Sequence, residues 1–177
     1  MPLRLSEFKP DTQAIGNGVV INQSGRKQTL ENNKQAFATD FVQRSRFTSA
    51  YPNSMTPADF VDRLFANAGV SPSESERTAA ISQFGSAATS SDAIARGRAL
   101  RRVAENATLI QQEFNRAFVL MQYFGYLRRD PNSGPESSFD GYNFWLSKLD
   151  TFSGNFRQAE MVKAFLVAGE YRQRFPR

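Results

Sequence analysis

The apolar residues of the chain recur at helical spacing over most of its length beyond residue 33. The most apolar stretch runs from Phe114 to Leu127, where Asn115, Arg116 and Gln122 are the only strongly polar positions. Its apolar side chains cover nearly every direction of a helical projection, and a helix that is apolar all round is normally buried. The pattern therefore predicts a central, fully buried helix over these residues.

Capping residues mark two further helix starts. Thr56 precedes Pro57, so its hydroxyl can cap a helix whose first position is a proline that needs no N–H. Ser71, Pro72 and Glu74 repeat this arrangement in the form of a capping box. We therefore predict one helix that begins at Pro57 and another that begins at Pro72.

The helix predicted after the linker 86–90 has an apolar side and a basic side. Its apolar side comprises Ile94, Leu100, Val103 and Ala104. The basic side carries Arg98, Arg101 and Arg102, which could bind phosphate groups. Arg101 and Glu105 stand four residues apart, however, and this is the spacing of an ion pair on a helix. We interpret the basic side as a solvated face with ion pairs.

Every element predicted beyond residue 32 is helical. Apolar periodicity and capping residues mark further helices at 33–47, at 140–150 and from 155 onwards. No alternation of the strand kind occurs after residue 30. The predicted fold class is therefore all-α, a helical bundle of about six helices with an N-terminal extended arm or short hairpin.

The predicted N-terminal arm covers residues 1–32. Its apolar residues are scattered among Pro10, Gly16, Gly18 and Gly25, which suits an extended chain with a short strand or hairpin and does not suit a helix. A disordered leader is the alternative, although the apolar residues argue for at least partial docking on the helical body.

Two helical segments follow the arm, a subdomain over residues 33–108 and a module over residues 109–177. The apolar and proline positions of residues 60–72 match those of residues 119–131 in spacing. The subdomain is therefore either a degenerate copy of the module or a set of helices whose core spacing happens to coincide with it.

The sequence contains no Cys and no His. Their absence excludes disulfides, thiolate nucleophiles, imidazole bases and the usual zinc, copper and haem sites, and it leaves only carboxylate chemistry. Glu105 and Glu113 fall at polar helical positions and form no recognisable pair of the glycosidase type. We therefore expect no enzymatic activity and no cofactor.

The charge balance is mildly basic. The 22 Lys and Arg residues outnumber the 17 Asp and Glu residues, which gives a net charge of +5 over 177 residues. No nucleic-acid-binding motif accompanies this charge, so it does not predict nucleic-acid binding. No apolar run approaches the roughly 20 residues of a membrane-spanning helix, and the N-terminus lacks the apolar centre of a signal peptide. We expect no membrane span.

Three blocks of residues occur in order in the second half of the chain. They are YFGYLRRDP at 123–131, GYNFWL at 141–146 and a closing block at 164–171 that ends in Glu-Tyr. In this order the blocks resemble the bacterial family known as domain of unknown function 4214, over about residues 113–175. The motif residues that carry the resemblance are Arg129, Asp130, Gly141, Trp145, Glu170 and Tyr171.

The sequence departs from the family pattern in three places. Leu127-Arg128-Arg129 replaces a tighter Leu-Gly-Arg, the loop 132–139 is longer, and Gly169 precedes Glu170. The resemblance implies a helical module that is usually a C-terminal or repeated part of large secreted or cell-surface bacterial proteins, with no assigned catalytic residues. It thus implies an extracellular or cell-surface, non-catalytic structural or protein-interaction module. Its partners would be other domains of the parent protein or cell-surface components.

We predict that the motif residues have a structural role. Arg129 or Arg128 should pair with Glu170 and hold the long loop against the last helix, with Trp145 packed beneath. Such a partly buried pair fixes geometry, and removing one partner leaves an unmatched charge.

A polysaccharide- or calcium-binding module is the alternative function. Tyr142 and Trp145 could form an aromatic platform for a sugar, although their helical spacing is typical of core packing. Pro135 and Gly141 break the helix–loop–helix calcium pattern, so turn formation and helix capping also explain the acidic residues of the loop. The weak candidates for calcium ligands are Asp130, Asn132, Glu136 and Asp140.

Overall fold

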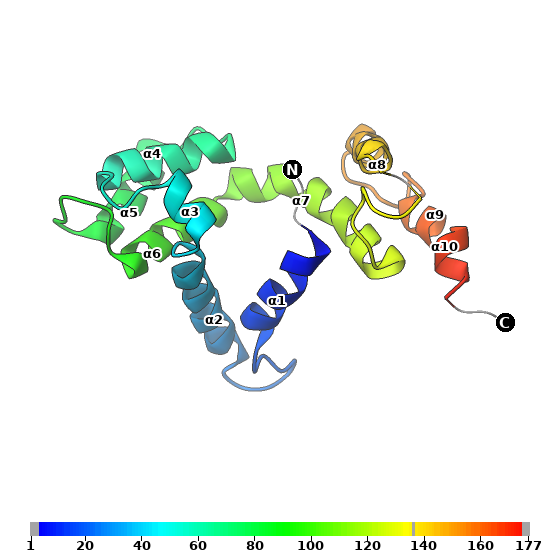
Figure 1. The fold of residues 1–177 in the computed structure, drawn as a ribbon, viewed down its shortest axis with the longest axis horizontal. Helices are drawn as coiled ribbons and strands as arrows, with labels where there is room; N and C mark the ends of the chain where they lie inside the picture. Colours follow the sequence, from blue (N-terminus) through cyan, green and yellow to red (C-terminus); the bar gives the residue numbers. More distant parts are fainter. Residues whose placement is uncertain (1–3, 136, 175–177) are drawn as a thin grey trace. The chain divides into compact units, whose positions relative to one another are not determined.

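The computed structural model describes residues 4–135 and 137–174. Across these residues the chain is 66% helical and contains no strand, so the predicted all-α class is confirmed. The α-helices of the described residues (Figure 1) are α1 (Leu5–Gly16), α2 (Arg26–Phe41), α3 (Ser45–Ala50), α4 (Pro57–Ala68), α5 (Glu74–Ile81), α6 (Ala93–Ala104), α7 (Ala107–Gln122), α8 (Asp140–Thr151), α9 (Met161–Val167) and α10 (Gly169–Arg172). A 3₁₀ turn covers Ser82–Phe84, and a π-helical turn covers Tyr123–Leu127 directly after α7.

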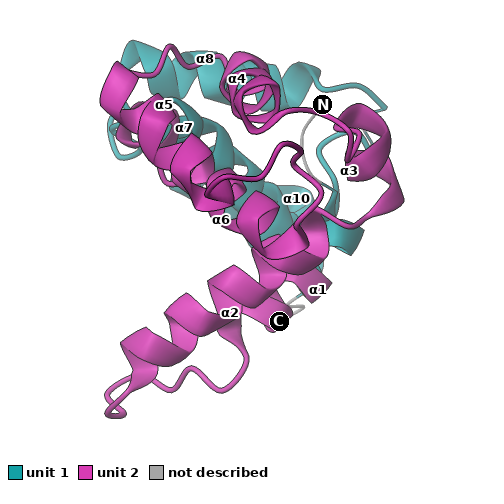
Figure 2. Cartoon of the chain, turned by 90° about the vertical axis from the view of Figure 1, so that its left-hand side faces the viewer, with its two compact units in different colours: residues 1–9, 111–177 teal, residues 10–110 magenta. Residues whose placement is uncertain are grey.

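The chain forms two compact units (Figure 2). Unit 1 comprises residues 1–9 and 111–177, and unit 2 comprises residues 10–110. The divisions fall inside α1 and α7, so each of these two helices contributes residues to both units. The second division lies close to the start of the module that the sequence predicts at residue 109.

The N-terminal residues form α1, where the sequence predicts an extended arm or a short hairpin. This part of the prediction is wrong, because Leu5 and Phe8 lie one helical turn apart and both pack on the core of unit 1. Their packing outweighs Pro10, which stands inside α1 and lacks a backbone N–H. Of the glycines that suggested an extended chain, Gly16 is the last residue of α1, whereas Gly18 and Gly25 lie between α1 and α2 with positive φ angles of 68° and 81°.

Unit 2 is built around α4 and α6. Thr56 caps α4 as predicted, because its hydroxyl accepts the N–H of Asp59 at 3.1 Å and Pro57 takes the first helical position. Helix α6 lies so close to α2 that a Cβ added at Gly97 would be 2.9 Å from the backbone nitrogen of Thr39. Gly97 therefore sets the spacing between α2 and α6. The aromatic side chains of the buried core are Phe47, Tyr51, Phe60, Phe65 and Phe84.

Helix α5 begins two residues later than predicted. Its N-cap is Ser73, whose hydroxyl accepts the N–H of Glu76 at 3.3 Å, while the Glu76 carboxylate accepts the N–H of Ser73 at 2.8 Å. Ser71 and Ser73 both stand three residues before a glutamate, so the local sequence allows either start. Asn106 selects the later one, because its side-chain amide donates to Glu76 Oε1 at 2.6 Å.

The buried side of α6 also differs from the prediction. Val103 is buried as expected, but Ile94 is 52% exposed and Ala104 is exposed, whereas Arg96 is only 1% exposed. The close approach of α2 requires a residue as small as Gly97 at that point of α6. Arg96 is buried because its guanidinium binds the carbonyls of Ser90 and Tyr51. The side of α6 that faces the core is therefore set by a neighbouring helix as well as by its own apolar residues.

Arg101, on the basic side of α6, forms ion pairs as predicted. Arg101 Nη2 lies 2.7 Å from Glu105 Oε1 and 2.6 Å from Glu31 Oε2. The hydrogen bonds that Glu31 accepts, first from Lys34 and to a smaller extent from Arg101, lower its pKa. These arginine and lysine side chains are thus engaged with acidic groups of the same unit.

The predicted central helix is not buried on all sides. One side of α7 is exposed to solvent, and on it Phe114 is 59% and Met121 is 43% exposed. Val119 of α7 packs in one core with Leu149 of α8 and Phe165 of α9, so these two helices cover another side of α7. The periodicity of α7 alone does not predict which side is covered. No helix in the described residues, α7 included, combines the length and the apolar content that a membrane span requires. The residues of α7 and the π-helical turn that enter the core of unit 1 are Val119, Tyr123, Phe124 and Leu127.

Candidate functional site

Arg129 is the centre of a polar corner in unit 1, which we define as Arg129, Asp130 and Glu170. Arg129 Nε lies 3.0 and 3.1 Å from the two carboxylate oxygens of Glu170, and Nη1 donates to the backbone carbonyls of Asp130 and Pro131 at 3.1 and 3.2 Å. The predicted ion pair is therefore present, and Arg129 makes it. The exposed fractions of its two side chains are 13% and 29%, so water screens it only in part.

Aromatic rings connect Trp145 to this corner. The guanidinium carbon of Arg129 lies over the ring of Tyr123, 5.4 Å from its centroid. The ring of Tyr123 packs edge-on against Phe165 at 5.1 Å, and Phe165 lies 5.8 Å from Trp145. Trp145 thus reaches the ion pair through two intervening rings, and no direct contact with the ion pair is seen among the described residues.

The remaining motif residues frame the corner. Tyr171 packs edge-on against Tyr126 of the π-helical turn, with ring centroids 5.6 Å apart. Gly141 is the second residue of α8. A glycine outside the motif also matters, because a Cβ at Gly134 would lie 3.0 Å from Cδ of Arg129, and its φ of 98° is strained for other residues. Gly134 therefore lets the loop lie directly on Arg129.

Asp130 binds the first helix of the chain. Its Oδ1 accepts the backbone N–H of Leu5 at 2.6 Å, across 125 residues of sequence. One turn later in α1, the ring of Phe8 packs 5.1 Å from that of Phe124. The first N–H groups of a helix lack partners within the helix, and a carboxylate there satisfies one of them and interacts favourably with the helix dipole. The sequence pattern gives no signal for this role of Asp130.

The four calcium candidates have different surroundings. Asp130 is engaged with the start of α1. Asp140 Oδ2 accepts the hydroxyl of Ser138 at 2.7 Å where α8 begins, and Asn132 is half-buried in the loop. Glu136 lies outside the described residues. Among residues 4–135 and 137–174, no group of three or more acidic side chains is placed to hold a metal ion.

Tyr142 and Trp145 do not form an open platform together. Tyr142 is buried, and its hydroxyl donates to the backbone carbonyl of Arg116 at 3.3 Å. Burial raises the pKa of this tyrosine. Trp145 is half-buried, and the Nζ atom of Lys148 lies over its ring, 5.3 Å from the centroid. A sugar could therefore reach only part of one ring.

Three exposed apolar side chains and one half-buried phenylalanine, Phe118, form a surface on unit 1 that the sequence pattern assigns to the core or does not single out. This surface, the α7 face, consists of Phe114, Phe118 and Met121 of α7 and Phe156 of the turn before α9. The ring centroid of Phe118 lies 6.4 Å from that of Phe114 and 5.2 Å from that of Phe156, with the planes inclined by 25° and 27°. Spacings of three and four residues place the three α7 members on one side of the helix. The three rings of the α7 face are therefore contiguous, and Met121 lies on the same side of α7.

Sequence reasoning also missed a buried arginine in unit 2. Arg96 donates from Nη1 to the backbone carbonyl and hydroxyl of Ser90 at 3.0 and 3.2 Å, and from Nη2 to the carbonyl of Tyr51 at 2.6 Å. Its guanidinium carbon lies 4.4 Å from the ring centroid of Phe60 and 5.5 Å from that of Phe47. Its Nε has no hydrogen-bond partner in the described part of the chain, and burial lowers its pKa. Arg96 fastens two loops to the core.

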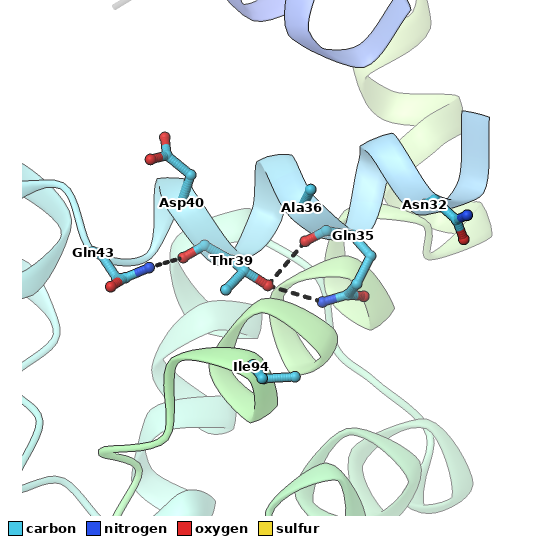
Figure 3. Close-up of a pocket in the computed structure, with 7 residues that line it drawn as sticks. All are labelled: Asn32, Gln35, Ala36, Thr39, Asp40, Gln43 and Ile94. Carbon is cyan, nitrogen blue, oxygen red and sulfur yellow. Dashed lines mark hydrogen bonds between the residues drawn. The ribbon is translucent and has the colours of Figure 1, made fainter. Parts of the chain in front are cut away.

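A groove of about 570 Å³ lies along α2 (Figure 3). The polar side chains of α2 and the exposed Ile94 of α6 line it. The hydroxyl of Thr39 donates to the carbonyl of Gln35 at 2.9 Å and accepts from the Gln35 amide at 3.2 Å, while the Gln43 amide donates to the Thr39 carbonyl at 2.8 Å. Because α2 satisfies these groups itself, the groove offers a ligand little that is specific.

Comparison of the chain with protein-family models, curated proteins and solved structures finds no match. The family resemblance of residues 113–175 therefore rests on the motif residues themselves.

Proposed function

We propose that the chain is a non-catalytic structural and protein-interaction module that contacts a folded protein partner through the α7 face of unit 1. The observation that supports this proposal is the exposure of Phe114, Met121 and Phe156 on that face, around the half-buried ring of Phe118. Contiguous apolar patches on a protein surface commonly mark the places that another surface covers.

Charged groups border the α7 face as they border protein interfaces. Glu113 and Arg116 form an exposed ion pair of 2.8 Å on the same helix as Phe114. The guanidinium carbon of Arg157 lies 6.0 Å from the ring centroid of Phe156. Interfaces concentrate aromatic and Met side chains at the centre and polar groups at the rim. Burial of each exposed ring by a partner would contribute up to about 1.5–3 kcal/mol.

The family resemblance supports a context for this module. Residues 113–175 resemble domains of large secreted or cell-surface bacterial proteins, so we propose that the partner is another domain of the parent protein or a cell-surface component. The absence of Cys and His supports a non-catalytic role, because most side-chain nucleophiles and bases are missing.

The alternative, a polysaccharide- or calcium-binding module, receives less support. A sugar site would have to rely on Trp145, since Tyr142 is buried and hydrogen-bonded within unit 1. A calcium site would have to take Asp130 from its hydrogen bond with Leu5. Either ligand would therefore compete with contacts that hold the unit together.

Photo-crosslinking tests the proposed interaction. A photoreactive phenylalanine analogue in place of Phe114 should form a covalent adduct with one protein partner in cells that produce the chain. The same analogue at Phe144 is the matched control, because Phe144 is 58% exposed but lies in α8, outside the α7 face. In chains that carry the analogue at 114, Phe156→Ser should reduce the adduct. Equal adduct at 114 and 144, or none at 114, would refute the proposal.

A further inference from the structure

Unit 1 contains a docking site that is already occupied by a short helical segment. Residues 4–9 belong to unit 1, although the rest of the unit begins at residue 111. The segment brings Leu5 and Phe8 to the core of the unit, and both side chains are half-buried there. The site is thus formed by one part of the chain and filled by another. It is distinct from the α7 face.

The docking site recognises the segment in two ways. The carboxylate of Asp130 accepts the N–H of Leu5 at 2.6 Å, which requires the free start of a helix. The ring of Phe124 receives Phe8 at 5.1 Å, one helical turn further along. Arg129 keeps the site in place, because it binds the carbonyl of Asp130 as well as Glu170. The site therefore selects a helical N-terminus with a Leu-x-x-Phe pattern.

The segment is joined to the remainder of α1 at a weak point. The division between the units falls between Lys9 and Pro10. Pro10 has no N–H and cannot complete the helical hydrogen bond to the fourth residue before it. Beyond Pro10, α1 is held by unit 2, through the 3.0 Å ion pair of Asp11 with Arg44 and the hydrogen bond from Asn33 to the Ile15 carbonyl. Residues 4–9 can therefore leave the site while the rest of α1 keeps its contacts.

We propose that the docking site exchanges its occupant, and that residues 4–9 of a second copy of the chain bind there in place of the chain's own segment. The contacts made by either segment are identical, so concentration decides between them. At low concentration each chain fills its own site. At high concentration two chains exchange their segments reciprocally and form a dimer.

A peptide-binding experiment tests whether the site is exchangeable. The full chain with Phe8→Ser has a weakened segment of its own, and a fluorescent, N-acetylated peptide of residues 4–16 should bind to it saturably, as measured by fluorescence anisotropy. The same peptide with Phe8→Ser is the matched control and should not bind. Asp130→Ala in the chain should weaken binding about fivefold, because the helix cap is lost.

The wild-type chain tests whether a second copy is the occupant. Sedimentation should show a dimer whose fraction grows with protein concentration and falls in the Phe8→Ser chain, and excess peptide should dissociate it. Circular dichroism confirms that the variant is folded, and Phe8→Leu replaces it if it is not. Failure of the peptide to bind either folded variant would overturn the exchangeable site. A peptide that binds while the wild-type chain stays monomeric at millimolar concentration would overturn the second copy as occupant.

Discussion

Arg129 and Glu170 form an ion pair between residues that are 41 positions apart in the sequence. The pair ties the loop that follows the π-helical turn to α10 at the end of the described chain. Arg129 also binds the carbonyls of Asp130 and Pro131, so its side chain organises the loop from which Asp130 reaches α1. The guanidinium group of Arg129 thus stabilises both the loop that contacts α1 and the attachment of α10.

Glu170→Ala should lower the free energy of unfolding by about 1–3 kcal/mol, because Arg129 would stay under the loop with its charge unmatched. Urea denaturation measures the change. Glu160→Ala is the matched control, since the 3.2 Å pair of Glu160 with Lys163 is exposed on both sides and should contribute less than about 1 kcal/mol. Equal losses of unfolding free energy in the two variants would show that the Arg129–Glu170 pair contributes no more than an exposed ion pair.

The caps of α4 and α5 give a second prediction. Thr56→Ala and Ser73→Ala should each reduce stability by about 1 kcal/mol, because each leaves a first-turn N–H without its acceptor. Ser71→Ala should change the denaturation midpoint little, since Ser71 is exposed and α5 begins beyond it. A loss at Ser71 as large as that at Ser73 would mean that α5 starts earlier than the structure shows.

The buried guanidinium of Arg96 gives a third prediction. Arg96→Ala should destabilise the chain by about 3 kcal/mol or more, because it leaves a cavity between two rings and unsatisfied carbonyls at Tyr51 and Ser90. Arg96→Met should cost less than Arg96→Ala, since its side chain fills the same space. Arg98→Ala, on the exposed side of α6, is the control and should be nearly neutral. Thermal unfolding of the three variants ranks them.

Acid should destabilise the chain in part through Asp62 and Arg77. Arg77 donates hydrogen bonds of 2.7 and 2.9 Å to the Asp62 carboxylate, and they lower the pKa of Asp62 below its usual value of 3.8. A carboxyl with a lowered folded-state pKa contributes stability above its unfolded pKa and loses that contribution as the pH falls through the folded value.

The thermal unfolding midpoint of the wild-type chain should therefore decrease as the pH is lowered below about 4. Asp62→Asn should show a shallower fall over the same range and a midpoint at neutral pH that is slightly lower than that of the wild type. Parallel curves for the two proteins would indicate that this pair does not contribute to acid sensitivity. The other carboxyls with lowered pKa, such as Glu31 and Glu76, keep the variant partly acid-sensitive.

Local signals in the sequence predicted the positions of the helices better than they predicted the contacts between helices. The cap at Thr56 needs only neighbouring residues, and the pairing of Glu170 with Arg129 or Arg128 was predicted because these motif residues fall at the ends of predicted helices. The start of α5 depended on Asn106, thirty residues away, and the burial of Arg96 on Tyr51 and Ser90, which accept its hydrogen bonds. The exposure of Phe114 depends on which side of α7 the neighbouring helices leave uncovered, and the sequence of α7 does not show this. In the last three cases, α5, Arg96 and Phe114, the outcome depends on another part of the chain.

The seating of residues 4–9 on unit 1 has a consequence for the order in which the chain folds as it is made. Unit 2 ends at residue 110, so all of its residues have been synthesised while most of unit 1 is still missing. Leu5 leaves the ribosome well before its acceptor on Asp130, which follows 125 residues later, and the Arg129 partner Glu170 comes later still. Long-range contacts of this kind form slowly because the intervening chain must first be closed into a loop. Residues 4–9 are therefore made before the rest of unit 1 but can dock only after it has been made.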